Sequence, residues 1–347
     1  MDTFPYGLQA ALVGLIAGLV LGLSARLGNF CTLGALESAA YGGDQRRLRL
    51  WGVVLAVAIA GTFVGAALGQ IQIANTFYHQ IAWNPWASVA GGLVFGYGMA
   101  LAGNCGFGAL VRFGGGDLRS LVVVVVMGIF GFITLSGPLA PLRVALFDQM
   151  ETRDPQGIAA TVQAITGLPQ LATALIVAAG FLLWALLHGP LRRQPVEIVW
   201  GVVAGAAVVF AYWGTSWVND ASMGEIGVEG LSFTAPVGRT LIFLMTSTAG
   251  GINFSVGSVL GVMAGALAGS LWRGMFRWEA CEDPRELGRQ VGGAALMGIG
   301  GVIALGCSVG QGVSAFATLA WSAPVTLAAI AAGALFGLRR LIGATAE

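Results

Sequence analysis

The sequence predicts an all-α protein that crosses a membrane several times and contains an internal inverted repeat. Of its 347 residues, 56% are hydrophobic and 10% are charged, whereas a soluble domain carries about 25% charged residues. The chain holds 55 glycines, and dense glycine in an apolar chain is typical of closely packed or broken membrane helices. The net charge of +1 provides no strongly basic face, which argues against nucleic-acid binding.

Nine segments approach the ~20 mainly apolar residues that a membrane-spanning helix needs. In chain order they cover residues 7–27, 50–74, 87–103, 118–136, 170–188, 195–213, 254–272, 290–305 and 320–338. Because this number is odd, we expect the two termini on opposite sides of the membrane.

Four further segments are too short or too polar to span. They cover residues 28–44, 104–113, 234–253 and 306–317, and three of them are rich in glycine. Non-helical backbone at membrane depth survives only where it is buried in protein or faces a cavity. We therefore expect these four segments to form re-entrant half-helices.

Arginine clusters predict the orientation, since cytoplasmic loops carry an excess of basic residues. Every cluster follows an odd-numbered segment: Arg46, Arg47 and Arg49; Arg112 and Arg119; Arg192 and Arg193; Arg273, Arg277, Arg285 and Arg289; Arg339 and Arg340. This places the N-terminus outside the cytoplasm and the C-terminus inside. The loop 214–234 then lies outside, and we expect its carboxylates Asp220, Glu225 and Glu229 to be solvated.

The chain also repeats a pattern at an offset of 202 residues. Gly91, Gly96, Gly98, Cys105 and Gly108 recur as Gly293, Gly298, Gly300, Cys307 and Gly310. On the predicted topology the two copies run in opposite directions. We therefore expect one membrane domain, 1–347, with halves 7–136 and 195–340 joined by a linker and connecting span, 137–194. Transporters with inverted repeats bind their substrates between the halves, on broken helices.

Three cysteines lie in the predicted breaks, each after a span and before a short helical stretch. The motifs are Gly28-Asn-Phe-Cys31-Thr-Leu-Gly34, Gly103-Asn-Cys105-Gly-Phe-Gly108 and Gly306-Cys307-Ser-Val-Gly310-Gln-Gly312. A helix N-terminus offers free N–H groups and a favourable dipole to an anion. A thiol is a weak donor with a soft, polarizable sulfur. It must stay protonated beside a sulfur-containing anion, because a thiolate would repel one.

Five neighbouring residues are further candidates for contact with a ligand. Asn104 is expected to cap the half-helix, Gly106 allows close approach to the backbone, and Ser308 and Gln311 offer donors to a ligand oxygen. Arg26 either attracts an anion or anchors its helix at the interface.

Other interpretations compete with a thiol-lined site. A buried membrane cysteine is often only a small packing residue, and Cys281, in a charged loop, is expected to be incidental. The chain has no C-x-x-C motif and no histidine beside a cysteine, so neither a metal site nor a dithiol relay is predicted.

At the three cysteine motifs and Arg112 the chain resembles the YeeE/YedE family of bacterial sulfur transport proteins, and this resemblance covers nearly all of it. The resemblance implies an inner-membrane importer of thiosulfate or a related inorganic sulfur anion, with no cofactor. It further implies passage through transient S–H hydrogen bonds along Cys31, Cys105 and Cys307. A cytoplasmic sulfur carrier of the TusA type is a common partner in this family.

Two alternatives to such a carrier remain open from the residues alone. One is an enzyme, a membrane thiol sulfurtransferase that forms a persulfide on Cys105 with Arg112 nearby. The other is a passive anion channel. The leading prediction is a transporter and not an enzyme.

Overall fold

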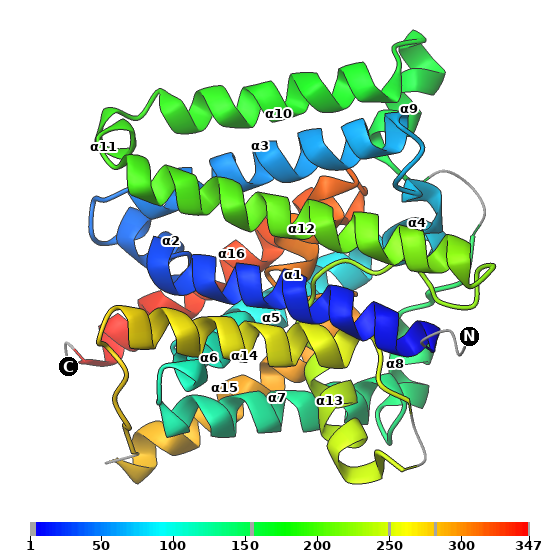
Figure 1. Ribbon diagram of the computed structural model, residues 1–347. Helices are drawn as coiled ribbons and strands as arrows, with labels where there is room; N and C mark the ends of the chain where they lie inside the picture. Colours follow the sequence, from blue (N-terminus) through cyan, green and yellow to red (C-terminus); the bar gives the residue numbers. More distant parts are fainter. Residues whose placement is uncertain (1–4, 153–155, 249–250, 281–282, 346–347) are drawn as a thin grey trace.

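The computed structural model describes residues 5–152, 156–248, 251–280 and 283–345, and across these ranges it forms helices without β-strands (Figure 1). Each of the nine predicted apolar segments corresponds to one long helix. These helices are α1 (Tyr6–Gly28), α3 (Arg46–Ala67), α5 (Pro85–Ala102), α7 (Leu118–Leu135), α10 (Gln170–Leu186), α12 (Pro195–Ala221), α14 (Phe254–Trp272), α15 (Pro284–Ile303) and α16 (Ser322–Thr345). They lie side by side, and the chain ends at opposite ends of the bundle (Figure 1).

Within the described residues, seven candidate spans are long and apolar enough to cross a membrane, and they include every long helix except α10 and α15. The α10 helix has 17 residues, and α15 begins with the charged residues Arg285, Glu286 and Arg289. The all-α, multi-pass membrane class is thus confirmed, whereas the predicted count of nine spans stays a prediction.

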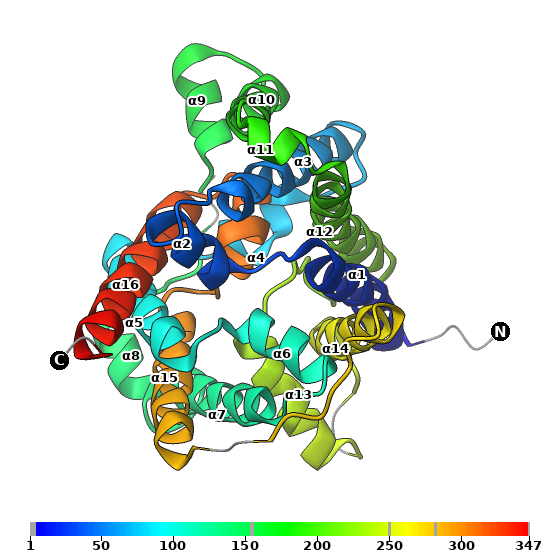
Figure 2. The same ribbon diagram turned by 90° about the vertical axis from the view of Figure 1, so that its left-hand side faces the viewer.

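A short helix forms in each of the four segments expected to be half-helices. They are α2 (Thr32–Ala40), α6 (Gly106–Gly114), α13 (Ala235–Thr246) and the π-helix η2 (Gly310–Ala315). Figure 2 looks nearly along the long helices and shows α6 inside the ring that they form. The remaining helices join the long ones: η1 (Ile73–Asn75), α4 (Phe77–Gln80), α8 (Ala140–Leu146), α9 (Ile158–Thr166) and α11 (Gly189–Arg192).

Glycines of the sequence repeat face one another where α5 packs against α15. A Cβ added at Gly91 would lie 2.8 Å from the carbonyl oxygen of Gly300, and one at Gly98 would lie 2.5 Å from that of Gly293. The repeat relates Gly91 to Gly293 and Gly98 to Gly300, so each contact becomes the other when the two halves are exchanged. Any larger side chain would separate the two backbones.

The same exchange relates other packed helix pairs. The α1–α14 pair matches α12–α3, α16–α5 matches α7–α15, and α6–α7 matches η2–α16. The remaining long helix, α10, lies at one edge of the bundle against α3 (Figure 1). We propose the halves 7–136 and 195–340 and the connector 137–194 on the strength of these matched pairs.

The segment predicted as a solvated outer loop, 214–234, differs from that expectation. Helix α12 continues to Ala221, and Val228, Leu231 and Phe233 are each at most 1% exposed. Asp220 and Glu225 are exposed, but Glu229 is only partly so. The reason is that residues 228–233 pack against the core beside Cys307, so this part of the loop belongs to the interior of the protein.

Candidate functional site

A residue with left-handed backbone conformation precedes each of the three cysteines. The residue two positions before each cysteine adopts a left-handed conformation: Asn29 (φ 54°), Gly103 (φ 73°) and Leu305 (φ 58°). This conformation ends the preceding helix. The carbonyl oxygens of Cys31, Cys105 and Cys307 then each accept an N–H from the residue four positions later, which starts a new helical turn. Each thiol therefore sits at the N-terminus of a short helix, as predicted.

Backbone amides orient two of the thiols. Cys105 Sγ accepts a hydrogen bond from the Gly108 amide at 3.3 Å. Cys307 Sγ accepts from the amides of Phe233 at 3.3 Å and Gly310 at 3.4 Å. Both cysteines are fully buried. These bonds use the sulfur lone pairs, so the backbone amides do not occupy the S–H hydrogens.

The three cysteine segments converge in the core. A Cβ added at Gly108 would lie 3.5 Å from Cys105 Sγ and 3.9 Å from Cys31 Sγ. Thr32, in the Cys31 segment, lies between the Cys105 and Cys307 segments. Its Oγ1 lies 3.9 Å from Cys105 Sγ and donates to Ser308 Oγ at 3.1 Å. The sequence predicted that the three cysteine segments lie near one another but missed Thr32, although Thr32 directly follows Cys31 in its motif.

Aromatic rings near each cysteine pack in series along the same core. The Phe30 and Phe107 ring centroids are 6.5 Å apart, and those of Phe107 and Phe233 are 5.1 Å apart. Trp51 stacks on Phe30 at 4.7 Å. These rings surround the thiol segments with apolar surface, so a hydrated ion would lose water on reaching the thiols.

Several pockets border the thiol segments, and two of them are lined in part by charged side chains. The first, of about 150 Å³, is called the α13 pocket and is lined by Phe77, Tyr78, Leu135, Glu229, Gly230, Ser232, Thr234, Ala235, Pro236, Arg239, Ser255, Gly301, Val302, Leu305 and Gly306. The second, of about 590 Å³, is called the α2 pocket and is lined by Asn29, Gly34, Glu37, Ser38, Tyr41, Gly42, Asp44, Arg46, Arg47 and Glu197. Helices α13 and α2 lie toward opposite ends of the bundle (Figure 1).

The α2 pocket brings positive charge close to Cys31. A Cβ added at Gly34 would lie 3.7 Å from Cys31 Sγ and 3.0 Å from a guanidinium nitrogen of Arg47. Hydrogen bonds from Arg46 hold the pKa of Asp44 below its ordinary value. Asp44 therefore stays ionised at neutral pH and balances the charge of Arg46.

Two predicted roles change in the structure. Asn104 was expected to cap the half-helix, but α6 begins at Gly106 and Cys105 occupies the cap position. The Oδ1 atom of Asn104 is buried without a hydrogen-bond partner, so it is a free acceptor near the thiols. Gly106 faces the side chain of Met127 and not open space that a ligand could fill, because an added Cβ would lie 2.5 Å from Met127 Sδ.

Gln311 and Ser308 lie in the buried site, whereas Arg26 makes its contacts elsewhere. Gln311 Nε2 already donates to the carbonyl oxygens of Ala304 and Leu305, so its amide nitrogen holds the end of α15. Arg26 packs between Gly269 and the loop residue Gly115, and none of its described contacts is with a cysteine.

Replacing Gln311 by methionine is expected to destabilise the break before Cys307. The substitution removes the donor from the buried carbonyl oxygen of Ala304 and from the partly buried one of Leu305, which costs about 1–3 kcal/mol. We expect a lower melting temperature in detergent for Gln311→Met, measured by intrinsic fluorescence. Gln163, which is exposed, provides the control: Gln163→Met should melt like the wild type, and an unchanged Gln311→Met would contradict this role.

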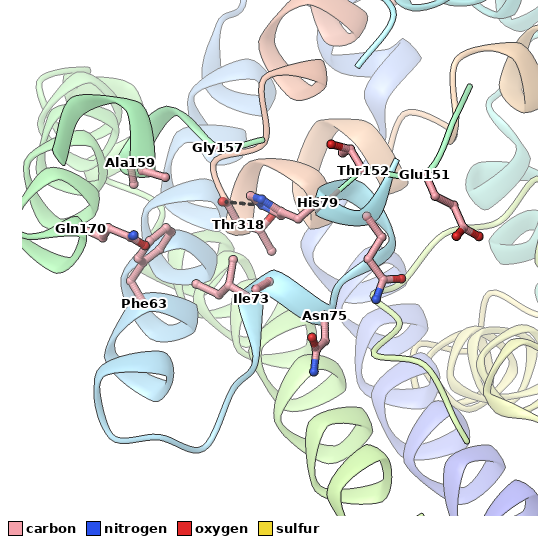
Figure 3. A pocket seen from close by; sticks show the side chains of 13 residues that line it. Phe63, Ile73, Asn75, His79, Glu151, Thr152, Gly157, Ala159, Gln170 and Thr318 are labelled. Carbon is pink, nitrogen blue, oxygen red and sulfur yellow. Dashed lines mark hydrogen bonds between the residues drawn. The ribbon is translucent and has the colours of Figure 1, made fainter. Parts of the chain in front are cut away.

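A separate cavity of about 770 Å³ lies beside α3, α4 and α9 (Figure 3). Its buried His79 bonds the carbonyl oxygen of Thr318 at 3.2 Å, and burial lowers the pKa of His79, so the ring is neutral at pH 7. Glu151 is the acidic side chain among its described lining residues. An acidic cavity without a thiol does not suit a sulfur anion, which leaves the cysteine segments as the candidate site.

Two curated proteins resemble the chain over most of their length. Thiosulfate transporter TsuA of Escherichia coli (strain K12) is 27% identical over 327 residues, which cover 89% of this chain and 88% of the relative. Thiosulfate transporter TsuA of Spirochaeta thermophila is 26% identical over 325 residues, which cover 90% and 94%. Both bear the name of a transporter and not that of an enzyme.

A protein family described as sulphur transport matches residues 27–336. The match includes all three cysteine motifs and both pockets. The chain therefore belongs to this sulphur transport family, the YeeE/YedE family that its cysteine motifs resemble.

Proposed function

We propose that this protein imports thiosulfate, or a closely related inorganic sulfur anion, across the bacterial inner membrane. The anion passes by transient S–H hydrogen bonds to Cys307, Cys105 and Cys31. The observation that carries the proposal is the convergence of the three thiol segments between two pockets at opposite ends of the bundle. The names of the two relatives support thiosulfate as the substrate.

Weak thiol contacts suit passage better than strong ones. Conduction needs sites that bind well enough to admit an ion and weakly enough to release it. An S–H group is a weaker donor than a hydroxyl or a guanidinium, and a line of such groups provides several shallow sites. The polarizable sulfur also matches the terminal sulfur of thiosulfate.

The arrangement around Cys105 favours a carrier over a sulfurtransferase. A persulfide-forming cysteine needs an electropositive neighbour that stabilises the thiolate. Cys105 caps the first turn of α6, whereas Arg112 lies exposed in the last turn of the same helix. Cys105 is also completely buried, which separates it from a bulky sulfur acceptor.

The orientation follows from the arginine clusters, with the N-terminus periplasmic and the C-terminus cytoplasmic. On this orientation the α13 pocket is the periplasmic entrance, and the α2 pocket is the cytoplasmic exit. Arg46, Arg47, Glu37 and Glu197 give the exit a mixed charge. A cytoplasmic sulfur carrier of the TusA type is the partner that we propose there.

Uptake of radiolabelled thiosulfate into vesicles that contain only the purified protein tests this function. We expect saturable uptake above the level of protein-free vesicles, with inhibition by excess unlabelled thiosulfate. Uptake equal to that of protein-free vesicles, for protein shown to be folded by its melting transition, would contradict the proposal. Uptake that rises linearly without saturation would instead indicate a passive channel.

A further inference from the structure

The α13 pocket leads directly to Cys307. Ser232 lines the pocket, and its Oγ lies 3.9 Å from Cys307 Sγ. The next residue, Phe233, donates its amide to the same sulfur, and Gly306, also in the lining, precedes Cys307 in the chain. The segment 229–234 thus lines the pocket at one end and contacts the buried thiol at the other.

The start of helix α13 offers an unused hydrogen-bond donor inside this pocket. Thr234 is 2% exposed, and its Oγ1 has no hydrogen-bond partner. It occupies the N-cap position but makes no side-chain cap, and a Cβ added at the lining residue Gly301 would lie 2.6 Å from its hydroxyl. A buried hydroxyl without a partner is costly, and at a helix N-terminus it adds to a site that already favours anions.

A charged side chain one turn further on completes the set of donors. Arg239 Nη1 lies 3.4 Å from Glu229 Oε1 and donates to Ser255 Oγ at 3.2 Å. Ser255 Oγ in turn donates to Glu229 Oε2 at 3.2 Å. All three residues line the α13 pocket. Arg239 therefore already binds the carboxylate of Glu229 in the α13 pocket, both directly and through Ser255.

We propose that the α13 pocket captures a tetrahedral sulfur oxyanion through Arg239, Ser232 and Thr234, with Glu229 as a built-in competitor for Arg239. This inference rests on the proposed function and adds the residues that receive the substrate. The Glu229–Arg239 pair is partly exposed, and such pairs are weak, so an arriving anion displaces the carboxylate. The negative charge of Glu229 then keeps the anion from binding too tightly to move on to Cys307.

The chemistry of these donors also predicts which step selects the substrate. Hydroxyl groups and a guanidinium recognise the oxygens of an oxyanion. Both sulfate and thiosulfate carry such oxygens. Capture at Arg239 is thus common to both ions, and the thiols discriminate between them. Sulfate should compete with thiosulfate for uptake without entering the vesicles itself.

Kinetics of thiosulfate uptake into vesicles of the full-length protein test the capture site. Losing one charge-assisted contact is expected to raise KM about tenfold for Arg239→Gln, with the maximal rate within about twofold of the wild type. Thr234→Val, which removes only the hydroxyl, should raise KM severalfold. Glu229→Gln should lower KM, because the competitor loses its charge. Arg143→Gln removes an arginine that lies outside this pocket, and should leave KM unchanged.

The outcomes separate this inference from the proposed function. If Arg239→Gln and Glu229→Gln both transport with the wild-type KM, the capture site is overturned while thiosulfate import stands. If Glu229→Gln raises KM, the carboxylate is not a competitor. If the wild-type protein takes up no thiosulfate, the proposed function itself fails. Melting temperatures equal to that of the wild type show that the variants are folded.

Discussion

Replacing either fully buried thiol by alanine is expected to reduce thiosulfate uptake to the level of protein-free vesicles. Cys105 and Cys307 lie on opposite repeat halves, and the contacts of Thr32 with Cys105 and Ser308 join their segments. Removing one donor from an apolar passage leaves a desolvated anion unpaired, which costs about 1–3 kcal/mol for each hydrogen bond lost. With no water to compensate, we expect about a fivefold to 150-fold loss of maximal rate for each hydrogen bond lost, from that term alone.

Cys281→Ala provides the matched control for these variants. Cys281 lies outside the described residues, and its charged sequence context predicts no part in transport. We expect normal uptake for Cys281→Ala and a wild-type amount of folded Cys105→Ala and Cys307→Ala in the membrane. Full uptake by the triple variant Cys31→Ala, Cys105→Ala, Cys307→Ala would contradict the role of the thiols.

Adding a single methyl group at Gly257 is expected to prevent folding. Helices α1 and α14 form a close pair, and a Cβ at Gly257 would lie 1.9 Å from the carbonyl oxygen of Ala11. The obstacle is backbone, so no side-chain movement relieves it. Overpacking in a core costs about 1–3 kcal/mol and occasionally more, and here both helices must move apart.

The measurement is the yield of monodisperse protein from membranes, with its melting temperature. Gly180→Ala is the control, since nothing lies within 4 Å of a Cβ added in that position of α10. We expect Gly257→Ala to be lost or to melt far below the wild type, and Gly180→Ala to behave normally. Normal yield and melting for Gly257→Ala would show that the two helices can accommodate a methyl group at their contact.

Much of the fold follows from local features of the sequence. Apolar runs of about 20 residues specify helices in a membrane, so all nine long helices were expected. The breaks were predictable because glycine and polar residues interrupt apolar runs at 28–44, 104–113, 234–253 and 306–317. The thiols were expected to meet, because two of them recur at the offset of an inverted repeat.

The contacts that complete the site depend on tertiary packing and leave little trace in the sequence. Ser232 and Phe233 reach Cys307 from a segment more than 70 residues away. Their sequence context, between carboxylates and a half-helix, looks like an outer loop. Asn104 was misassigned as a cap because the helix begins one residue later than expected, a shift within the ordinary uncertainty of helix boundaries.

Gln311 illustrates a second kind of error. Its side chain was expected to serve a ligand, but the left-handed break at Leu305 and Gly306 leaves carbonyl oxygens at the end of α15 without helical partners. The amide nitrogen of Gln311 satisfies two of them. The need to pair these carbonyl oxygens depends on the path of the backbone through the break, which the sequence alone does not give.

Uptake of thiosulfate labelled separately on its two sulfur atoms, into vesicles that contain only this protein, tests the central claim most directly. Passage along unreacted thiols predicts that both labels accumulate in equal amounts, while mass spectrometry finds Cys31, Cys105 and Cys307 unmodified. A sulfurtransferase would instead break the S–S bond, leave the terminal sulfur on a cysteine as a persulfide and release sulfite. Retention of only the terminal label on the protein, with release of labelled sulfite, would contradict the account.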